Sequence, residues 1–257
     1  MKIQQTNSAV PCEVIRVREQ AQTTMLFLHG GGYVCCSPQT QRPITITLTR
    51  LLAAQTYVPE YRLAPEHPFP AAVEDAIAVY ELVSAEAAKS KTSFVLAGDS
   101  AGGGLVIALA IHARDAGLPM PSSILTFSPW VDLTSEREGE MQRRENLCDM
   151  FYAESFTAYS AAYLQGAEPR SPLASPLFAD LSNLPPLLIE VSDTELLYDE
   201  AVQLAERWRQ SGNVVELNVS PRLPHGWQML TPFVPEAYES LARAAAFVRQ
   251  QLPVARA

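Results

Sequence analysis

The chain contains no apolar run long enough to cross a membrane. Its longest candidate, Leu105–Ile111, falls far short of the roughly eighteen residues that a spanning helix needs. The first residues, Met1–Asn7, contain no apolar core of signal-peptide length. These absences predict neither a membrane partner nor a secretion signal, and we expect a cytoplasmic protein.

Cysteine and basic residues are also scarce. The 19 Lys and Arg residues are outnumbered by 28 Asp and Glu residues, and the resulting net charge of −9 argues against a nucleic-acid partner. The four cysteines show no metal-ligand spacing, and two of them are adjacent, which makes them poor disulfide partners. We therefore expect reduced thiols and no metal site for the set Cys12, Cys35, Cys36 and Cys148.

Short β-like runs alternate with helical patterns along the whole chain, which indicates βα units and a mostly parallel sheet. The predicted strands are Cys12–Val17, Met25–Leu28, Phe94–Ala97, Ser123–Phe127, Leu187–Val191 and Val214–Val219. The predicted helices are Gln41–Ala54, Ala71–Ala88, Gly103–Ala116, Glu200–Ser211 and Ala237–Gln251. With 257 residues, the chain suits a single α/β domain, 1–257, whose sheet is flanked by helices.

Two regions depart from this rhythm. A central strand is expected after the helix ending near Ala54, yet only Thr56–Glu60 is available and it contains Pro59, which cannot donate to a sheet ladder. We expect that strand to be short and irregular, or some residues to be missing. The second region, 133–180, mixes charged residues, an aromatic helical patch and Pro/Ser loops. It predicts a cap or lid, with an ordinary surface insertion as the alternative.

The segment Gly98-Asp99-Ser100-Ala101-Gly102 matches the pattern G-x-S-x-G, with a β-like run before it and a helical stretch after it. In that setting, a sharp turn from strand to helix exposes the central serine as a nucleophile, and the glycines leave room for the turn. The pattern therefore favours Ser100 as a catalytic nucleophile. The alternative is an ordinary glycine-rich turn.

A serine nucleophile needs a histidine base, and on this architecture the base follows the serine in the chain. His29 and His67 precede Ser100, and His112 lies on the same predicted helix, roughly 18 Å away at 1.5 Å per residue. His225 remains, in the loop before the final helix. Elimination therefore assigns the base to His225.

The base needs an orienting acid, which should follow the strand Leu187–Val191. Glu190 lies within that strand, and Asp199 suits the start of the next helix. Asp193 and Glu195 both lie in the loop at the strand end. Residue by residue, these two remain equal candidates.

The transition state needs donors for its oxyanion. His29-Gly30-Gly31-Gly32 directly follows a predicted strand, and Gly31 and Gly32 can bring their N–H groups close to a ligand. The N–H of Ala101, next to the nucleophile, completes the predicted oxyanion hole. A phosphate-binding loop is the alternative for the glycines.

Taken together, these motifs resemble the hormone-sensitive-lipase-like carboxylesterases of the α/β-hydrolase superfamily. The likeness is carried by His29–Val34, Tyr61–Ala72, Gly98–Gly103 and Ser128–Leu133, with Pro185–Glu200 and His225-Gly226 fitting as well. The resemblance implies an α/β-hydrolase fold and favours Glu195, which occupies the first position of the family's Asp-Pro-Leu-x-Asp-Glu segment. This chain departs from that segment with Glu for Asp and Leu for Pro. The resemblance also implies that His29 and Asp99 brace the loops around the site.

A further departure concerns the cap. Similar proteins carry a longer helical stretch before the glycine motif, whereas here twenty-eight residues precede His29. We therefore expect a reduced cap and a more open cleft.

The sequence thus predicts a serine carboxylesterase that acts on small-molecule esters with a short acyl chain, without a cofactor. An amide, lactone or N-acetyl substrate would use the same chemistry and stays an alternative. A non-catalytic ligand-binding relative and an esterase of reduced activity are the others. A homodimer joined through edge strands is expected by analogy with similar proteins alone.

Overall fold

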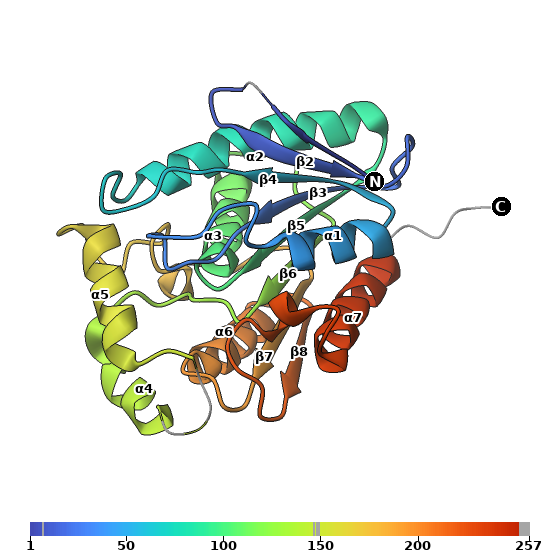
Figure 1. Cartoon of the computed structure of the whole chain (residues 1–257). Coiled ribbons are helices and arrows are strands. Elements are labelled where there is room, and N and C mark those ends of the chain that lie inside the picture. Colours follow the sequence, from blue (N-terminus) through green and yellow to red (C-terminus); the bar gives the residue numbers. More distant parts are fainter. Residues whose placement is uncertain (7, 146, 148–149, 252–257) are drawn as a thin grey trace.

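The computed structural model describes residues 1–6, 8–145, 147 and 150–251 (Figure 1). Within these residues, eight strands form one sheet: β1 (Lys2–Gln5), β2 (Cys12–Arg16), β3 (Thr23–Leu28), β4 (Ala54–Pro59), β5 (Ser93–Asp99), β6 (Ser123–Phe127), β7 (Leu187–Ser192) and β8 (Val215–Ser220). Their spatial order is β1-β2-β4-β3-β5-β6-β7-β8. The pairs β1–β2 and β2–β4 are antiparallel and all the others are parallel. The predicted α/β class with a mostly parallel sheet is confirmed.

The helices follow in chain order. They are α1 (Arg42–Leu51), α2 (Ala71–Ser90), α3 (Ala101–Asp115), α4 (Glu138–Arg144), α5 (Ala153–Leu164), α6 (Tyr198–Gln210) and α7 (Pro235–Gln251). The six strands and five helices predicted from the sequence are all present, with ends shifted by up to three residues. The strand β1 was not predicted, because its sequence Lys-Ile-Gln-Gln is polar and mostly exposed at the edge of the sheet.

Two helical layers cover the sheet. One face packs against α2, α3 and α6, and the other packs against α1 and α7. Alternate residues of β3 serve the two faces: Leu26 and Leu28 belong to the first core, and Met25 and Phe27 to the second. Strands buried on both faces read as continuous apolar runs, which is why these strands were visible in the sequence.

The strand β4 corrects one expectation. It is neither short nor irregular, since six residues pair with β2 on one side and β3 on the other. Its pairing with β3 runs from Ala54 to Tyr57, so Pro59 comes after the last pair. The missing N–H of Pro59 therefore costs no ladder bond to β3.

The segment 133–180 lies between β6 and β7 and contains α4 and α5. The aromatic patch predicted to be helical forms α5. Figure 1 shows α4 and α5 together, apart from the two helical layers that cover the sheet. No helix in the described part of the chain is long and apolar enough to span a membrane.

A buried ion pair ties the last helix to the sheet. Glu190 of β7 is fully buried, and Arg243 of α7 donates to both of its carboxylate oxygens, at 3.0 and 2.7 Å. The amide of Asn218 donates to the same carboxylate at 3.0 Å. Burial raises the pKa of Glu190, although the guanidinium opposes that shift. Glu190 is therefore a structural carboxylate, consistent with its position inside the strand.

We expect Arg243→Met to lower the free energy of unfolding by about 2–4 kcal/mol, because it leaves the Glu190 carboxylate buried without its cation. Urea unfolding followed by circular dichroism measures the loss. The double variant E190L/R243M removes both charges and should recover most of it. Equal unfolding midpoints for R243M and the unchanged protein would contradict this role.

Candidate active site

The carboxyl ends of the parallel strands meet at one edge of the sheet, where loops after β3, β5, β7 and β8 come together. A pocket of about 210 Å³ lies there. The loops after β3, β5 and β8 contribute to its wall, together with residues from and just before α5. The lining residues are Gly31, Gly32, Cys35, Cys36, Gln41, Asp99, Ser100, Met150, Phe151, Phe156, Tyr159, His225, Gly226 and Met229. Four of the six residues predicted for catalysis and oxyanion binding thus share one cavity.

Ser100 occupies the turn between β5 and α3 in a conformation that is unfavourable for a side chain. Its φ is +53° and its ψ is −123°. Three backbone hydrogen bonds hold it there: its N–H donates to the carbonyl of Phe127 at 2.8 Å, and its carbonyl accepts from Gly104 and Trp130 at 3.2 and 2.9 Å. The strain is therefore compensated by the surrounding backbone, as is typical of functional turns.

The glycines of this turn are required by close backbone approach. A Cβ at Gly98 would lie 2.4 Å from the carbonyl oxygen of Gly102, and a Cβ at Gly102 would lie 2.1 Å from that of Leu28. Both distances are far inside van der Waals contact. The spacing of the G-x-S-x-G pattern thus reflects how tightly α3 starts against β3 and β5.

His225 follows β8 and is held by a buried carboxylate. Its Nδ1 lies 2.7 Å from Oε2 of Glu195, and the two side chains are 6% and 0% exposed as residues. The other oxygen of Glu195 accepts from the N–H of Ser192 at 2.7 Å and from the hydroxyl of Ser128 at 2.8 Å. Both carboxylate oxygens are therefore fixed, and the plane of the imidazole is fixed with them.

The other three carboxylates near this strand end have different partners. Asp193 is exposed and accepts from the N–H of Arg222 at 2.8 Å. Asp199 pairs with Arg144, and Glu190 pairs with Arg243. Of the two acids that residue-by-residue reasoning left equal, Glu195 is thus the one in contact with His225.

The glycine loop after β3 provides part of the pocket wall. Gly31 and Gly32 have φ values of +115° and +60°, in the region that side chains rarely adopt. A Cβ at Gly32 would lie 2.7 Å from the ring of Tyr159, so this position is crowded as well. Ala101 is the first residue of α3, where backbone N–H groups have no partner inside the helix. Its residue is fully buried beneath the turn.

Asp99, which precedes Ser100, binds the glycine loop to the serine turn. Its Oδ1 accepts from the N–H of Gly30 at 2.9 Å, and its Oδ2 accepts from the amide of Gln41 at 3.2 Å. Burial raises the pKa of Asp99 from 3.8 to about 6. The bracing role that the resemblance implied for Asp99 is matched by these contacts, whereas the part taken by Gln41 was not predicted.

His29 is a second brace on the same loop. Its ring stacks on that of Tyr61 with centroids 4.2 Å apart, and its Nδ1 lies 2.7 Å from the carbonyl of Gly30. The hydroxyl of Tyr61 donates to the carbonyl of His29 at 2.6 Å. Burial lowers the pKa of His29 to about 4, so the ring is neutral near pH 7.

Aromatic side chains from the segment 133–180 form the opposite wall. The ring of Phe151 meets that of His225 edge-on, with centroids 5.4 Å apart. Phe151 also contacts Phe156, which in turn contacts Trp130, at centroid distances of 5.8 and 5.3 Å. The sequence placed an insertion here but gave no residue-level signal for these contacts, because they depend on how α5 lies over the strand ends.

Thiols also line the pocket, which the sequence did not predict. Cys35 and Cys36 are free and exposed, with their sulfur atoms 3.8 Å apart. Cys12 is free and buried, and Cys148 lies outside the described residues. Among the residues that the structure describes, no three His, Cys, Asp or Glu side chains cluster as metal ligands do.

Comparison with known proteins places this site in a family. A profile described as the alpha/beta hydrolase fold matches residues 25–229. The chain is 40% identical over 239 residues to an acetyl-hydrolase of Streptomyces hygroscopicus, covering 92% of this chain and 79% of that protein. It is 32% identical to an esterase of Acinetobacter venetianus, covering 91% of this chain and 77% of the relative. The class of protein is therefore the α/β hydrolases.

Solved structures narrow the class. A crystal structure of an esterase from the bacterial hormone-sensitive lipase family is 38% identical with a TM-score of 0.89, covering 98% of this chain and 85% of the other. The esterase EstE5, in crystals soaked with p-nitrophenyl butyrate, is also 38% identical with a TM-score of 0.89, over 97% and 84% of the two chains. The chain belongs to the hormone-sensitive-lipase-like carboxylesterases, the family that its motifs resemble.

We expect Asp99→Asn to change how stability depends on pH. Because the folded state raises the pKa of Asp99 from 3.8 to about 6, ionisation of this carboxyl lowers the stability as pH rises through that window. Asparagine keeps an acceptor for Gly30 and does not ionise. D99N should therefore gain stability relative to the unchanged protein between pH 4 and 7, by up to about 3 kcal/mol.

Urea unfolding of both proteins across this pH range measures the difference. The titration of His29, whose pKa is lowered to about 4, acts in the opposite direction. It is present in both proteins and cancels in the comparison. A difference in unfolding free energy that stays constant with pH would contradict the assignment.

Proposed function

We propose that the chain hydrolyses carboxylic esters with short acyl chains, with Ser100 as nucleophile, His225 as base and Glu195 as orienting acid. The observation that carries this proposal is the imidazole of His225, fixed by Glu195 at 2.7 Å and lining the same pocket as Ser100. With Glu195 ionised, Nδ1 of His225 carries the proton and Nε2 keeps its lone pair. That is the tautomer a general base needs.

The proposed reaction has two stages. The hydroxyl of Ser100 attacks the ester carbonyl while Nε2 of His225 takes its proton, and the C–O bond to the alcohol then breaks as His225 returns the proton to the leaving oxygen. A water molecule, activated by His225, next attacks the acyl-serine and releases the acid. The N–H groups of Gly31, Gly32 and Ala101 stabilise the oxyanion in both stages.

The size of the pocket supports a short acyl chain. At about 210 Å³ it is smaller than the roughly 300–1,000 Å³ of sites that enclose a drug-sized ligand. Relatives named acetyl-hydrolase, from Streptomyces hygroscopicus and Mycobacterium tuberculosis, agree with a small acyl group. We further propose that the segment 133–180 acts as a cap, since Phe151, Phe156 and Tyr159 face Ser100 across the pocket.

We expect Ser100→Ala to reduce kcat for p-nitrophenyl butyrate by about 10⁵–10⁶-fold, because no other group on the proposed path forms the acyl-enzyme. Steady-state hydrolysis followed by nitrophenolate absorbance measures it, and a fluorophosphonate probe should label Ser100 in the unchanged protein only. Retained turnover in S100A would refute the proposal.

The two candidate acids can be separated by a matched pair of variants. Glu195→Gln should lower kcat about 10³–10⁴-fold, because the amide cannot hold the reactive tautomer of His225. Asp193→Asn removes a charge of the same loop that contacts Arg222 and should change kcat less than about twofold. The opposite ranking would transfer the role to Asp193.

A further inference from the structure

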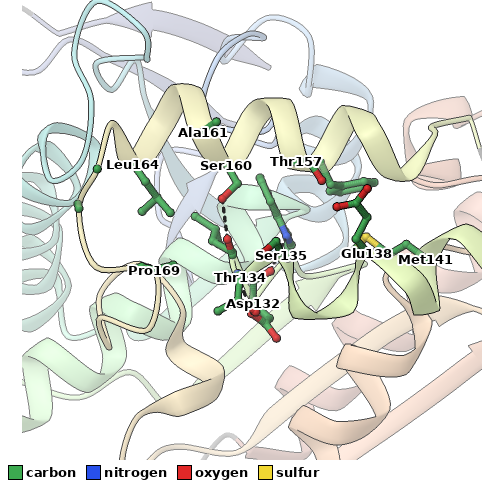
Figure 2. Close-up of a pocket in the computed structure, with 15 residues that line it drawn as sticks. Asp132, Thr134, Ser135, Glu138, Met141, Thr157, Ser160, Ala161, Leu164 and Pro169 are labelled. Atoms are coloured by element: carbon green, nitrogen blue, oxygen red, sulfur yellow. Dashed lines mark hydrogen bonds between the residues drawn. The ribbon is translucent and has the colours of Figure 1, made fainter.

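A second cavity, of about 300 Å³, lies between α5 and the segment 132–141 (Figure 2). Figure 2 shows Thr157, Ser160, Ala161 and Leu164 of α5 on one side of it, and Asp132, Thr134 and Glu138 on the other. Its floor consists of buried apolar side chains: Trp130, Leu133, Met141, Phe156 and Leu164. This cavity takes no part in the proposed mechanism.

One side chain separates the two cavities. Phe156 lines both the pocket of Ser100 and the second cavity, and it is the one residue their described linings share. Its ring is held between those of Phe151 and Trp130, and the residue is only 6% exposed. Trp130 in turn donates its N–H to the carbonyl of Ser100. The second cavity therefore begins one aromatic ring away from the reacting serine.

The polar groups around the second cavity are largely engaged with one another. The hydroxyl of Ser160 donates to the carbonyl of Leu133 at 2.6 Å. The carboxylate of Asp132 accepts from the hydroxyl of Thr134 at 2.7 Å and from Arg137 at 2.9 Å. The apolar floor is thus the part open to a ligand, and hydrocarbon is the chemistry that it favours.

We propose that Phe156 sets the length of the substrate chain that this esterase accepts, and that the second cavity takes the end of a longer chain once the ring is removed. This inference rests on the proposed esterase function. A chain that extends from the reacting carbonyl toward α5 ends against the Phe156 ring. Replacing the ring with a methyl group joins a volume of about 300 Å³ to the pocket of about 210 Å³.

The test compares Phe156→Ala and Phe156→Leu with the unchanged protein. One arm measures kcat/KM for p-nitrophenyl acetate, butyrate, octanoate and decanoate, and the second arm measures acetate esters of alcohols with the same chain lengths. We expect F156A to raise the octanoate-to-butyrate ratio, or its alcohol counterpart, at least about tenfold, since each added methylene that is buried contributes to binding. F156L should give a smaller change in the same direction. The arm that responds identifies which part of the ester points toward α5.

Two controls make the test specific to the second cavity. Ala161→Phe fills that cavity from an exposed position on α5 that does not line the Ser100 pocket. It should leave the ratio unchanged when Phe156 is present and cancel the gain in F156A. Phe151→Ala removes a ring that lines only the Ser100 pocket, so any gain there should not respond to A161F.

The outcomes are distinguishable. If the unchanged protein does not hydrolyse p-nitrophenyl butyrate, the proposed function fails before this inference is reached. If it does, and thermal unfolding shows that F156A or F156L is folded, an unchanged ratio in both arms overturns the role of Phe156. A gain that A161F does not cancel overturns the role of the second cavity.

Discussion

The architecture of the site depends on one constrained turn. Ser100 adopts a positive φ because Phe127, Gly104 and Trp130 bond its backbone from three sides. Those partners come from β6, α3 and the loop after β6, so the parallel pairing of β5 with β6 must form before the serine can be held. The local strain is thus balanced by the long-range order of the sheet.

Buried polar side chains transmit this order to the neighbouring loops. Asp99 links the serine turn to the glycine loop, and Glu195 links β7 to the histidine loop through Ser192, Ser128 and His225. Each of these carboxylates lies in a place that water does not reach, where an unpaired oxygen would be costly. Loops that carry little regular structure are therefore positioned as accurately as the strands they follow.

The sequence was informative where local chemistry determines the structure. Strands such as β3 and β5 are apolar on both faces, and the turn at Ser100 requires glycine at Gly98 and Gly102, so their patterns were visible without coordinates. The regularity of β4 was missed, because the effect of Pro59 depends on where the pairing with β3 stops. The contact of Glu195 with His225 joins loops thirty residues apart, and residue types alone left Asp193 as an equal alternative.

The helix that begins at the serine turn has an electrostatic consequence. α3 is fifteen residues long, almost all of it is buried, and its first turn lies directly beneath Ser100. The aligned peptide dipoles of such a helix place a partial positive charge at its amino end. Negative charge that develops on a bound carbonyl oxygen would lie at this end, within the low-dielectric interior. Dissolved ions screen buried charges weakly, so the rate of acyl transfer should vary little with ionic strength.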